Sequence, residues 1–371
     1  MLIGVPKEIK THEYRVGLVP ASVRELVTHG HEVIVETNAG AGIGLGDEAY
    51  RAAGARIVPT AQEVFATSEM VVKVKEPQPQ ECRALREDQI LFTYLHLAAD
   101  RDQTEALMQS GCVAVAYETV TDRHGRLPLL APMSEVAGRM SVQVGAHYLE
   151  KMQGGAGVLL GGVPGVQAAK VVVLGGGVSG TNAVRMAMGM EASVFVIDKN
   201  LERLYELDLQ FGAMLNTVFS TVDSIEQHVG TADLVIGAVL VPGAAAPKLI
   251  TRKMIERMRP GSVFVDIAID QGGCSETSRP TTHADPVYTE GGVIHYCVTN
   301  MPGAVARTST FALNNATLPF ALALADKGYR KAIQDDPNLA NGLNVIHGRL
   351  TYEAVAKSLR LPFTPAKQAL G

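Results

Sequence analysis

The chain has 371 residues, which at a typical domain size of about 150 residues corresponds to between two and three domains. Hydrophobic residues make up 47% of it and charged residues 19%, a composition that excludes intrinsic disorder. The formal net charge of -5 argues against a surface for nucleic acid or for anionic membranes. Glycine accounts for 37 of the 371 residues, more than the usual share of about 7%, and such an excess is typical of α/β proteins that bind nucleotides.

The cysteines and the N-terminus indicate the compartment. The four cysteines lie far apart and form no C-x-x-C pair, so we interpret them as free thiols: Cys82, Cys112, Cys274 and Cys297. The N-terminal segment is charged by its seventh residue and lacks the apolar core of a signal peptide. No apolar run approaches the roughly 18 residues that span a bilayer. The sequence therefore predicts a cytoplasmic protein.

Short β-branched runs alternate with helical patterns in the first 130 residues. About six strands are expected there, among them 2–5, 32–36, 70–75, 90–95 and 113–118. Helices are expected between them, including one that begins at Pro20 and is stopped by Gly30, and one that begins at a capping box of Thr60 and Glu63. This alternation predicts parallel strands crossed by helices.

The pattern changes near residue 131. One long amphipathic helix is expected over 131–155, with Ser134 as its N-cap, and it is long enough to bridge two domains. A second alternation follows, with five apolar strands expected within 169–177, 192–200, 232–241, 261–270 and 291–300. A helix over 309–329 is expected to pack back on the first domain, followed by polar turns and a short helix.

The strongest local motif begins at the first strand of the second alternation. That strand leads into Gly175, Gly177 and Gly180 at G-x-G-x-x-G spacing, then a helix, then a strand that ends at Asp198. The glycines allow a tight turn, close approach to a pyrophosphate and close helix packing, and the acid accepts hydrogen bonds from a ribose. This pattern predicts a dinucleotide site that prefers NAD to NADP. Residues 40–46 are equally rich in glycine but miss the spacing, and we interpret them as a flexible loop.

Together these patterns predict an α/β protein with two doubly wound, Rossmann-like domains, each with a parallel sheet, joined by long helices and separated by a cleft. Residues 1–130 form the first part of a substrate domain, and residues 131–304 form the NAD-binding domain. Residues 305–371 form C-terminal helices that return to the substrate domain.

Three polar side chains lie where strands of the first domain end, the edge at which open sheets bind ligands. Lys75 ends a predicted strand, with Lys73 on the same face. The alternative interpretation is that either lysine is simply exposed to solvent at the strand end. His96 follows a buried strand, where a histidine is also often structural. Arg15 lies in a polar loop, where a surface arginine is the ordinary expectation. In the second domain, Asp270 is expected to share a strand face with Asp266, and either acid alternatively caps a turn.

Five segments carry motifs that occur together in one family, and they are GVPKEIKTHEYRVGLVP, VKVKEP, TYLHLA, VFVDIAIDQGG and VTNMPGAVARTST. With the glycine-rich loop, they make the chain resemble the L-alanine dehydrogenase family over essentially its whole length. The resemblance implies an oxidoreductase that uses NAD to convert L-alanine to pyruvate and ammonium and back. It also implies a homohexamer.

By position, the resemblance implies that Arg15 and Lys75 hold the substrate and that His96 and Asp270 form an acid/base pair. A histidine suits this role because it titrates near neutrality. Because these two residues come from different domains, the pair would form only when the cleft is closed. The resemblance also implies NAD contacts by Ser134, Val178, Asp198, Arg203, Ser220, Val239, Leu240, Ile267, Ala268, Ile269, Asp270, Arg279, Val298, Thr299, Asn300 and Met301.

Two further expectations concern metals and rival functions. Some members of the family carry a histidine where this chain has Lys327, a position associated there with Glu118 in binding a divalent cation, so no metal site is expected. The nearest rival function is the NAD-binding, hydride-donating subunit of proton-translocating transhydrogenase, which needs no amino-acid site. A saccharopine-type dehydrogenase and a catalytically inactive NAD sensor are weaker rivals.

Overall fold

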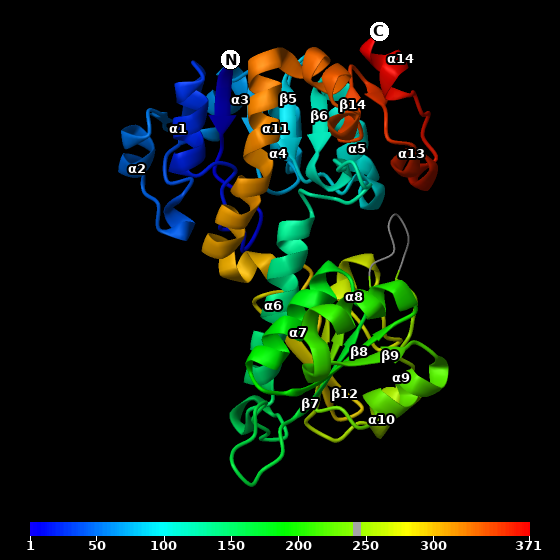
Figure 1. Cartoon of the computed structure of the whole chain (residues 1–371). Coiled ribbons are helices and arrows are strands. Elements are labelled where there is room, and N and C mark those ends of the chain that lie inside the picture. Colours follow the sequence, from blue (N-terminus) through cyan, green and yellow to red (C-terminus); the bar gives the residue numbers. More distant parts are fainter. Residues whose placement is uncertain (240–245) are drawn as a thin grey trace. The chain divides into compact units, whose positions relative to one another are not determined.

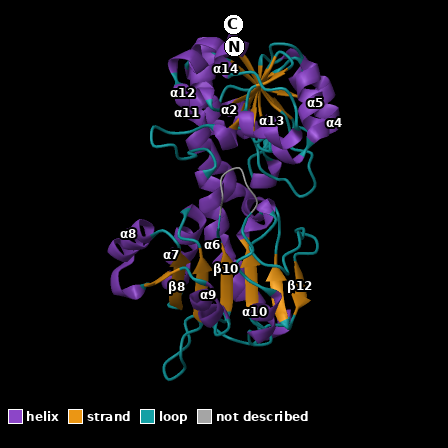
Figure 2. Cartoon of the chain, turned by 90° about the vertical axis from the view of Figure 1, so that its right-hand side faces the viewer, coloured by secondary structure: helices purple, strands orange, loops and turns teal. Residues whose placement is uncertain are grey.

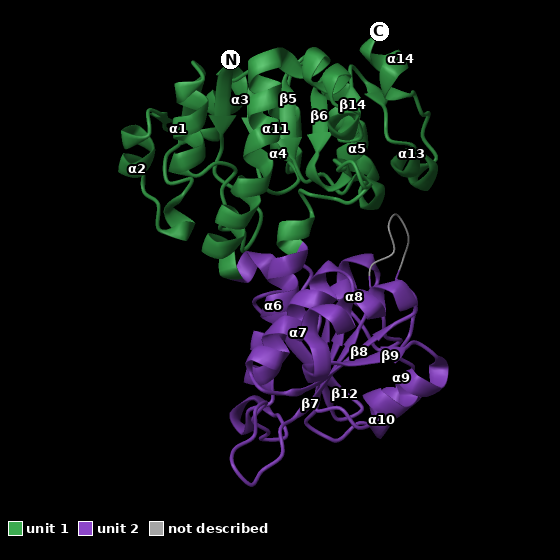
Figure 3. Cartoon of the chain, in the orientation of Figure 1, with its two compact units in different colours: residues 1–133, 305–371 green, residues 134–304 purple. Residues whose placement is uncertain are grey.

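The computed structural model describes residues 1–239 and 246–371. Leu240, which the resemblance implies as an NAD contact, lies outside these residues. The described chain divides into two compact units, which Figure 3 shows in different colours. Unit 1 comprises residues 1–133 and 305–371, and unit 2 comprises residues 134–304.

Unit 1 is built on one sheet, whose strands in the described chain run in the order β15-β14-β6-β5-β4-β1-β2-β3. The strands are β1 (Leu2–Val5), β2 (Glu32–Glu36), β3 (Arg56–Val58), β4 (Met70–Val72), β5 (Ile90–Thr93), β6 (Val113–Ala116), β14 (Leu343–Ile346) and β15 (Arg349–Leu350). Strands β1 to β6 are parallel, whereas β14 and β15 are antiparallel to their neighbours. The strand order reverses between β1 and β4, which makes this the switch point of a doubly wound sheet.

Helices cover both faces of this sheet. They are α1 (Pro20–Thr28), α2 (Asp47–Ala52), α3 (Ala61–Thr67), α4 (Pro79–Ala84), α5 (Arg101–Ser110), α11 (Ala306–Asp335), α12 (Pro337–Ala340), α13 (Glu353–Leu359) and α14 (Ala366–Leu370), with short 3-10 helices η1 (Ala41–Ile43), η2 (Leu97–Ala99) and η3 (Tyr117–Thr119). Figure 2 shows α11 and α12 on one side of the strands and α4 and α5 on the other. Buried Leu91, Leu107 and Val345 belong to the core that this arrangement encloses.

Local signals in the sequence explain several helix ends. Gly30, with φ 85, follows the end of α1, where a left-handed residue terminates a helix. The Thr60 hydroxyl accepts the backbone N–H of Glu63 at the start of α3. The predicted end of α1 and the predicted start of α3 are therefore confirmed.

Helix α6 (Ala131–Tyr148) spans the boundary between the two units (Figure 1). The prediction that Ser134 caps it is wrong, because Ser134 lies inside the helix. The chain already turns at Leu127, whose carbonyl accepts the N–H of Ala131, and Pro132 suits the first helical turn. The predicted helix over 131–155 also ends early, at Tyr148, and a separate 3-10 helix, η4 (Lys151–Gln153), follows.

The first five strands of unit 2 repeat the strand order of the first five in unit 1. The described strands of unit 2 run β12-β13-β11-β10-β7-β8-β9, with a reversal between β7 and β10. They are β7 (Lys170–Leu174), β8 (Ser193–Asp198), β9 (Asn216–Phe219), β10 (Leu234–Gly237), β11 (Val263–Asp266), β12 (Val287–Glu290) and β13 (Val293–Tyr296). The helices are α7 (Val178–Gly189), α8 (Leu201–Phe211), α9 (Val222–Val229) and α10 (Arg252–Arg257), with η5 (Gly212–Met214), η6 (Ile267–Gln271) and η7 (Met301–Val305).

The predicted fold class is confirmed, with differences at the sheet edges. Each sheet is mostly parallel but ends in antiparallel pairing, at β14 and β15 in unit 1 and at β12 in unit 2. The expectation of wholly parallel sheets is wrong there. Residues 305–371 therefore supply two strands as well as helices. None of the helices in the described part of the chain is both long and apolar enough to cross a membrane.

Candidate functional site

The glycine-rich loop of unit 2 has the geometry that its spacing predicts. Gly175 follows β7 with φ 96, and a Cβ there would lie 2.8 Å from the carbonyl oxygen of Ala238, across the switch point. A Cβ at Gly180 would lie 1.8 Å from the carbonyl oxygen of Gly175, so helix and loop pack too closely for any side chain. Gly177 is the N-cap of α7 and provides no side-chain cap. The first-turn N–H groups of α7 therefore face the loop as donors for an anion.

Asp198 and Arg203 are both hydrogen-bonded to the backbone of this loop. The Asp198 carboxylate accepts the N–H groups of Gly176, at 2.6 Å, and Asn200, at 2.9 Å. The Arg203 guanidinium donates to the carbonyl oxygen of Gly176 at 2.7 Å and to the Thr181 hydroxyl at 2.7 Å. A carboxylate at the end of β8 is thus held directly beside the loop.

The other residues that the resemblance implies as NAD contacts also follow strands of this sheet. Ser220 follows β9, Val239 follows β10, residues 267–270 form most of η6 after β11, and residues 298–301 follow β13. Val178 is the exposed first residue of α7. All of these positions lie at the carboxyl ends of the parallel strands, where doubly wound sheets bind ligands. Ser134 lies on α6, half-buried.

Asp266 and Asp270 do not share a strand face, which corrects that prediction. Strand β11 ends at Asp266, and Asp270 lies exposed in the 3-10 helix η6 that follows. Asp266 is fully buried and accepts the N–H of Ala268 at 3.0 Å, the N–H of Cys274 at 2.9 Å and the hydroxyl of Ser278 at 2.5 Å. Burial raises the pKa of Asp266, although these hydrogen bonds oppose the rise. Asp266 thus anchors the turn that carries Asp270.

Arg279 is positioned by an aromatic stack that the sequence analysis missed. Its guanidinium carbon lies 3.8 Å from the ring centroid of Tyr288, and the backbone N–H of Arg279 donates to the Tyr288 hydroxyl at 2.9 Å. The Tyr288 ring in turn stacks on buried His295, with centroids 5.0 Å apart. No short-range signal links these residues, because they meet only through the antiparallel pairing of β12 and β13.

In unit 1, the predicted substrate residues follow neighbouring strands. Arg15 lies in the connection after β1, Lys75 follows β4 and His96 follows β5. Because β5, β4 and β1 are adjacent and parallel, all three belong to one edge of the sheet, next to its switch point. Glu118, in η3, follows the next strand, β6.

Arg15 is buried and paired with Glu13. Its Nε donates to Glu13 Oε1 at 2.7 Å and its Nη2 to Oε2 at 2.6 Å, while Nη1 lies 3.1 Å from the sulfur of Met133. Burial opposes the charge, but the hydrogen bonds and charge of Glu13 outweigh it and raise the pKa of Arg15 above its usual range. Arg15 is therefore a fixed cation rather than the surface arginine of the alternative interpretation.

Lys73 and Lys75 have different environments. Strand β4 ends at Val72, so the predicted strand to Lys75 is too long. Lys73 is fully buried, with its Nζ 3.1 Å from Glu8 and 2.8 Å from Glu81. Lys75 is half-buried, its Nζ 3.8 Å from Glu76, and its N–H donates to Glu8 at 3.3 Å. Neither is simply a solvated lysine.

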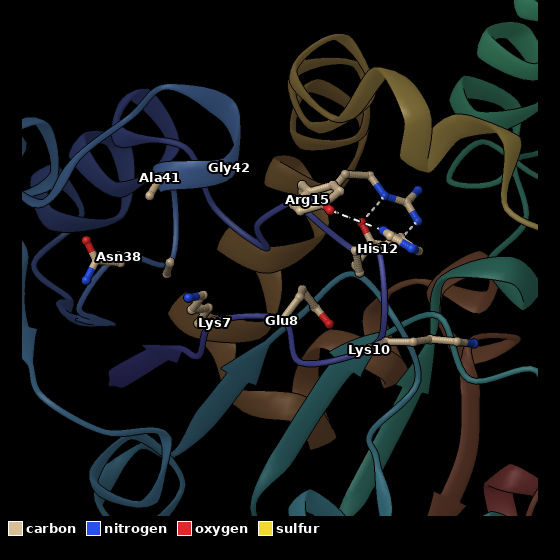
Figure 4. Close-up of a pocket in the computed structure, with 11 residues that line it drawn as sticks. Lys7, Glu8, Lys10, His12, Arg15, Asn38, Ala41 and Gly42 are labelled. Carbon is tan, nitrogen blue, oxygen red and sulfur yellow. Dashed lines mark hydrogen bonds and ion pairs between the residues drawn. The ribbon is translucent and has the colours of Figure 1, made fainter. Parts of the chain in front are cut away.

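A hollow of about 360 Å³ lies beside Arg15 within unit 1 (Figure 4). Its lining comes from two segments, and consists of Lys7, Glu8, Lys10, His12, Glu13, Tyr14, Arg15, Asn38, Ala39, Ala41 and Gly42. The second segment includes part of the glycine-rich stretch 40–46, in which η1 forms and a Cβ at Gly42 would lie 2.9 Å from the carbonyl oxygen of Tyr14. Ala41 and Gly42 of that stretch thus line the hollow, and residues 41–43 form a 3-10 helix where an irregular loop was expected.

His96 has an unusual backbone conformation. It is exposed and left-handed, with φ 52 and ψ 36, which costs about 1–3 kcal/mol for a residue with a side chain. Its ring stacks on that of Tyr94, with centroids 5.8 Å apart and planes 10° apart. Such outliers persist only when the surroundings enforce them, and they cluster at functional sites.

Glu118 and Lys327 each interact with groups of this chain. Glu118 accepts the N–H of Leu95 at 3.2 Å and that of His96 at 2.6 Å. Lys327 forms an ion pair with Asp335 at 2.8 Å. In the described part of the chain, no group of three or more His, Cys, Asp or Glu side chains is arranged to hold a metal ion.

Two doubly wound units, one with a dinucleotide loop and one with cationic residues at its switch point, define a nucleotide-dependent α/β protein. Two family models match this chain: "Alanine dehydrogenase/PNT, N-terminal domain" over residues 4–137 and "Alanine dehydrogenase/PNT, C-terminal domain" over residues 141–353. The chain therefore belongs to the alanine dehydrogenase/PNT family.

Full-length relatives agree with this assignment. The chain is 60% identical to alanine dehydrogenase of Halomonas elongata over 371 residues, all of both chains, and 54% identical to that of Bacillus subtilis over 372 residues, covering 100% of this chain and 98% of the relative. A solved L-alanine dehydrogenase that is 56% identical superposes with a TM-score of 0.94, covering 97% of this chain and 99% of the other. The predicted family and enzyme class are confirmed.

The rival subunit has a more distant match. A transhydrogenase structure from Sinorhizobium meliloti is 24% identical, with a TM-score of 0.84, and covers 95% of this chain and 100% of its own. At that identity the likeness shows the fold alone.

Proposed function

We propose that this protein catalyses the NAD-dependent oxidative deamination of L-alanine to pyruvate and ammonium, and the reverse reductive amination. One observation carries the proposal: Arg15, Lys75 and His96 follow three adjacent strands at the switch point of one sheet, in a chain whose other unit carries a dinucleotide loop. A cation pair and a titratable ring suit an amino acid that must be held and deprotonated.

The residues at the switch point of unit 2 fit NAD. The space above Gly175 and Gly180 has no room for a Cβ, and the uncapped first turn of α7 offers N–H groups to a pyrophosphate. Asp198, at the end of β8, would accept a hydrogen bond from a ribose hydroxyl. When bound, NAD supplies the acceptor for the hydride that leaves Cα of alanine.

The residues of unit 1 would hold the substrate. Arg15 offers planar donors to the carboxylate of alanine, and Glu13 fixes the plane of that guanidinium. Lys75 adds a positive charge near the reacting carbon. Its main chain is held by Glu8, which also accepts the N–H of Val74 at 2.7 Å.

Protons must move after the hydride leaves. Water adds to the resulting iminium carbon and loses a proton, and the nitrogen takes up a proton. The nitrogen then leaves as ammonia while the hydroxyl loses its proton to form the carbonyl, and ammonia takes up a proton to become ammonium. We assign these transfers to His96 and Asp270, one in each unit. The balanced reaction consumes alanine, water and NAD⁺ and yields pyruvate, ammonium, NADH and one proton.

We also propose a homohexamer that works in the cytoplasm. The segment after η4 exposes Leu159, Val163 and Val166, each more than half accessible, and large exposed apolar groups mark protein interfaces. The cysteines are unpaired thiols, which fits a reducing compartment. Light scattering on a size-exclusion column would give the mass of the assembly.

The experiment is a substrate comparison with the purified protein. L-alanine with NAD⁺ is expected to yield pyruvate and NADH in equal amounts, well ahead of L-leucine and of saccharopine. Hydride transfer from NADH to an NADP⁺ analogue without alanine would favour the transhydrogenase reading. NADH binding with no turnover of any amino acid would favour a sensor.

A further inference from the structure

The left-handed turn at His96 is hydrogen-bonded to one side chain. The N–H groups of Leu95 and His96 both point to the Glu118 carboxylate, at 3.2 Å and 2.6 Å. Successive N–H groups that converge in this way form a nest, which binds an anion. Here the anion is part of the chain, and it comes from the turn after the neighbouring strand.

The sheet register brings these groups together. Strands β5 and β6 are parallel with Thr93 opposite Ala116, so the turns that follow them emerge side by side. Glu118 is the second residue of η3, and His96 is the N-cap of η2. The buried Gln103 side chain donates to the carbonyl oxygen of Leu95 at 2.9 Å and fixes the other side of that residue.

The ring of His96 has a second support. It lies nearly parallel to the ring of Tyr94, which is buried and donates its hydroxyl to the carbonyl oxygen of Leu129 at 2.5 Å. Glu118 therefore sets the backbone of His96, and Tyr94 supports its ring. Both oxygens of Glu118 accept main-chain N–H groups, so the carboxylate is used to hold the backbone.

We propose that Glu118 is a positioning residue for His96: its two main-chain hydrogen bonds hold the imidazole where the proton transfer requires it. The inference rests on the proposed function of His96. A displacement of a reacting group by about 1 Å can lower a rate roughly 100-fold, so the loss of this hold should appear in kcat.

The test is a double-mutant cycle with Glu118→Gln and His96→Ala in the full-length enzyme. Glu118→Gln keeps the size of the side chain but places an amide against two N–H donors. It is expected to lower kcat about 10- to 100-fold while the Kd for NADH stays within twofold. In the His96→Ala background it should change kcat less than twofold, because a residue that acts through another shows no independent effect. An effect of the same size in both backgrounds would mean a merely structural role and would overturn the inference.

A matched control is Glu69→Gln. Glu69 accepts the N–H of Leu2 at 2.6 Å, a bond of the same type in the same unit, but it lies just before β4, at the amino end of the strands. Glu69→Gln should leave kcat within twofold of wild type. If it slows the enzyme as much as Glu118→Gln does, the loss is general and the inference fails.

Chemical rescue guards against a folding defect. In Glu118→Ala, formate can enter the space left by the carboxylate and accept the same two N–H groups, and it should raise kcat at least fivefold. It should not raise kcat of His96→Ala or of wild type. Absence of rescue in folded Glu118→Ala would count against the inference. A loss of kcat in Glu118→Gln that changes on addition of Mg²⁺ or EDTA would also count against it.

The two proposals fail separately. If His96→Ala keeps wild-type turnover, the proposed role of His96 is wrong. If His96→Ala is inactive but Glu118→Gln is as fast as wild type, only the positioning role is wrong.

Discussion

The Asp198 carboxylate lies 2.6 Å from the backbone nitrogen of Gly176, so the acid at the end of β8 is tied to the dinucleotide loop. A 2′-phosphate on the ribose would approach a carboxylate that cannot swing away without breaking this bond. Arg203, the nearby cation, is already directed at the loop and at Glu206.

We therefore expect NAD to be preferred over NADP. A like-charge contact costs several kcal/mol, so the ratio of kcat/KM values should be about 100-fold or more. Asp198→Ala should narrow that ratio at least tenfold, whereas Asp208→Asn, an exposed change on α8, should leave it unchanged. Equal kcat/KM for the two cofactors in the wild type would contradict the prediction.

Arg15→Ala is expected to weaken pyruvate binding. A charge-assisted pair contributes about 1.5–3 kcal/mol, so KM for pyruvate should rise roughly 10- to 100-fold with NADH affinity unchanged. The substitution also removes the ion pair between the guanidinium and buried Glu13, which should lower the free energy of unfolding by about 3–5 kcal/mol.

The double variant Glu13→Gln/Arg15→Ala separates the two effects. Removing both charges should restore much of the stability but none of the affinity. Urea unfolding and steady-state kinetics on the three proteins provide the measurement. A double variant that regains wild-type KM would show that Arg15 does not hold the substrate.

Two histidines in the connection between α1 and β2 bind Asp326 of α11, and the stability that this contact contributes depends on pH. Asp326 lies 2.7 Å from His31 and 3.1 Å from His29, and hydrogen bonds from these rings lower the pKa of Asp326. A lowered pKa in the folded state means that the stabilisation is present above the unfolded pKa of about 3.9 and is lost as pH falls through the folded value.

Asp326→Asn should therefore lower Tm by about 1–3 °C at pH 7, and the difference from wild type should shrink toward zero below about pH 4. Asp285→Asn, at another exposed position, serves as the control. A difference in Tm that is the same at pH 7 and pH 3 would rule out this ion pair as its source.

The buried thiols should resist alkylation. Burial raises the pKa of Cys82 to about 11 and that of Cys112 and Cys297 to about 12, and it also raises the pKa of Cys274. Because the thiolate is the nucleophile, we expect iodoacetamide at pH 8 to leave the native protein unmodified and active. Mass spectrometry should detect four adducts only after unfolding, and rapid labelling of native protein would show that the cores open.

Short-range patterns predicted those parts of the molecule that depend on neighbours in the sequence. The loop from Gly175 to Asp198 is one example, because its glycines, its helix and its terminal acid follow one another within a single β-α-β unit. The alternation of strands and helices is another. Even so, the helix start at Ser134 was misplaced, since a turn at Leu127 continues directly into α6.

Features built from distant segments were not predicted. Strand β14 joins the sheet by pairing with β6, more than two hundred residues earlier, and β15 joins it by pairing with β14. Likewise, no local pattern relates Glu118 to His96 or Glu8 to Lys73, because only the register of the sheet brings their strand ends together. The period-2 pattern predicts the same strand face for Lys73 and Lys75, but Lys73 is fully buried whereas Lys75 is half-buried.

Single-turnover oxidation of NADH by pyruvate and ammonium tests the central claim that His96 and Asp270 carry the protons, because in this direction the proton transfers precede hydride transfer. We predict that His96→Ala and Asp270→Asn each slow this step about 10²- to 10⁴-fold, while NADH affinity and Tm stay near wild type. Near wild-type hydride transfer in both folded variants would contradict the claim.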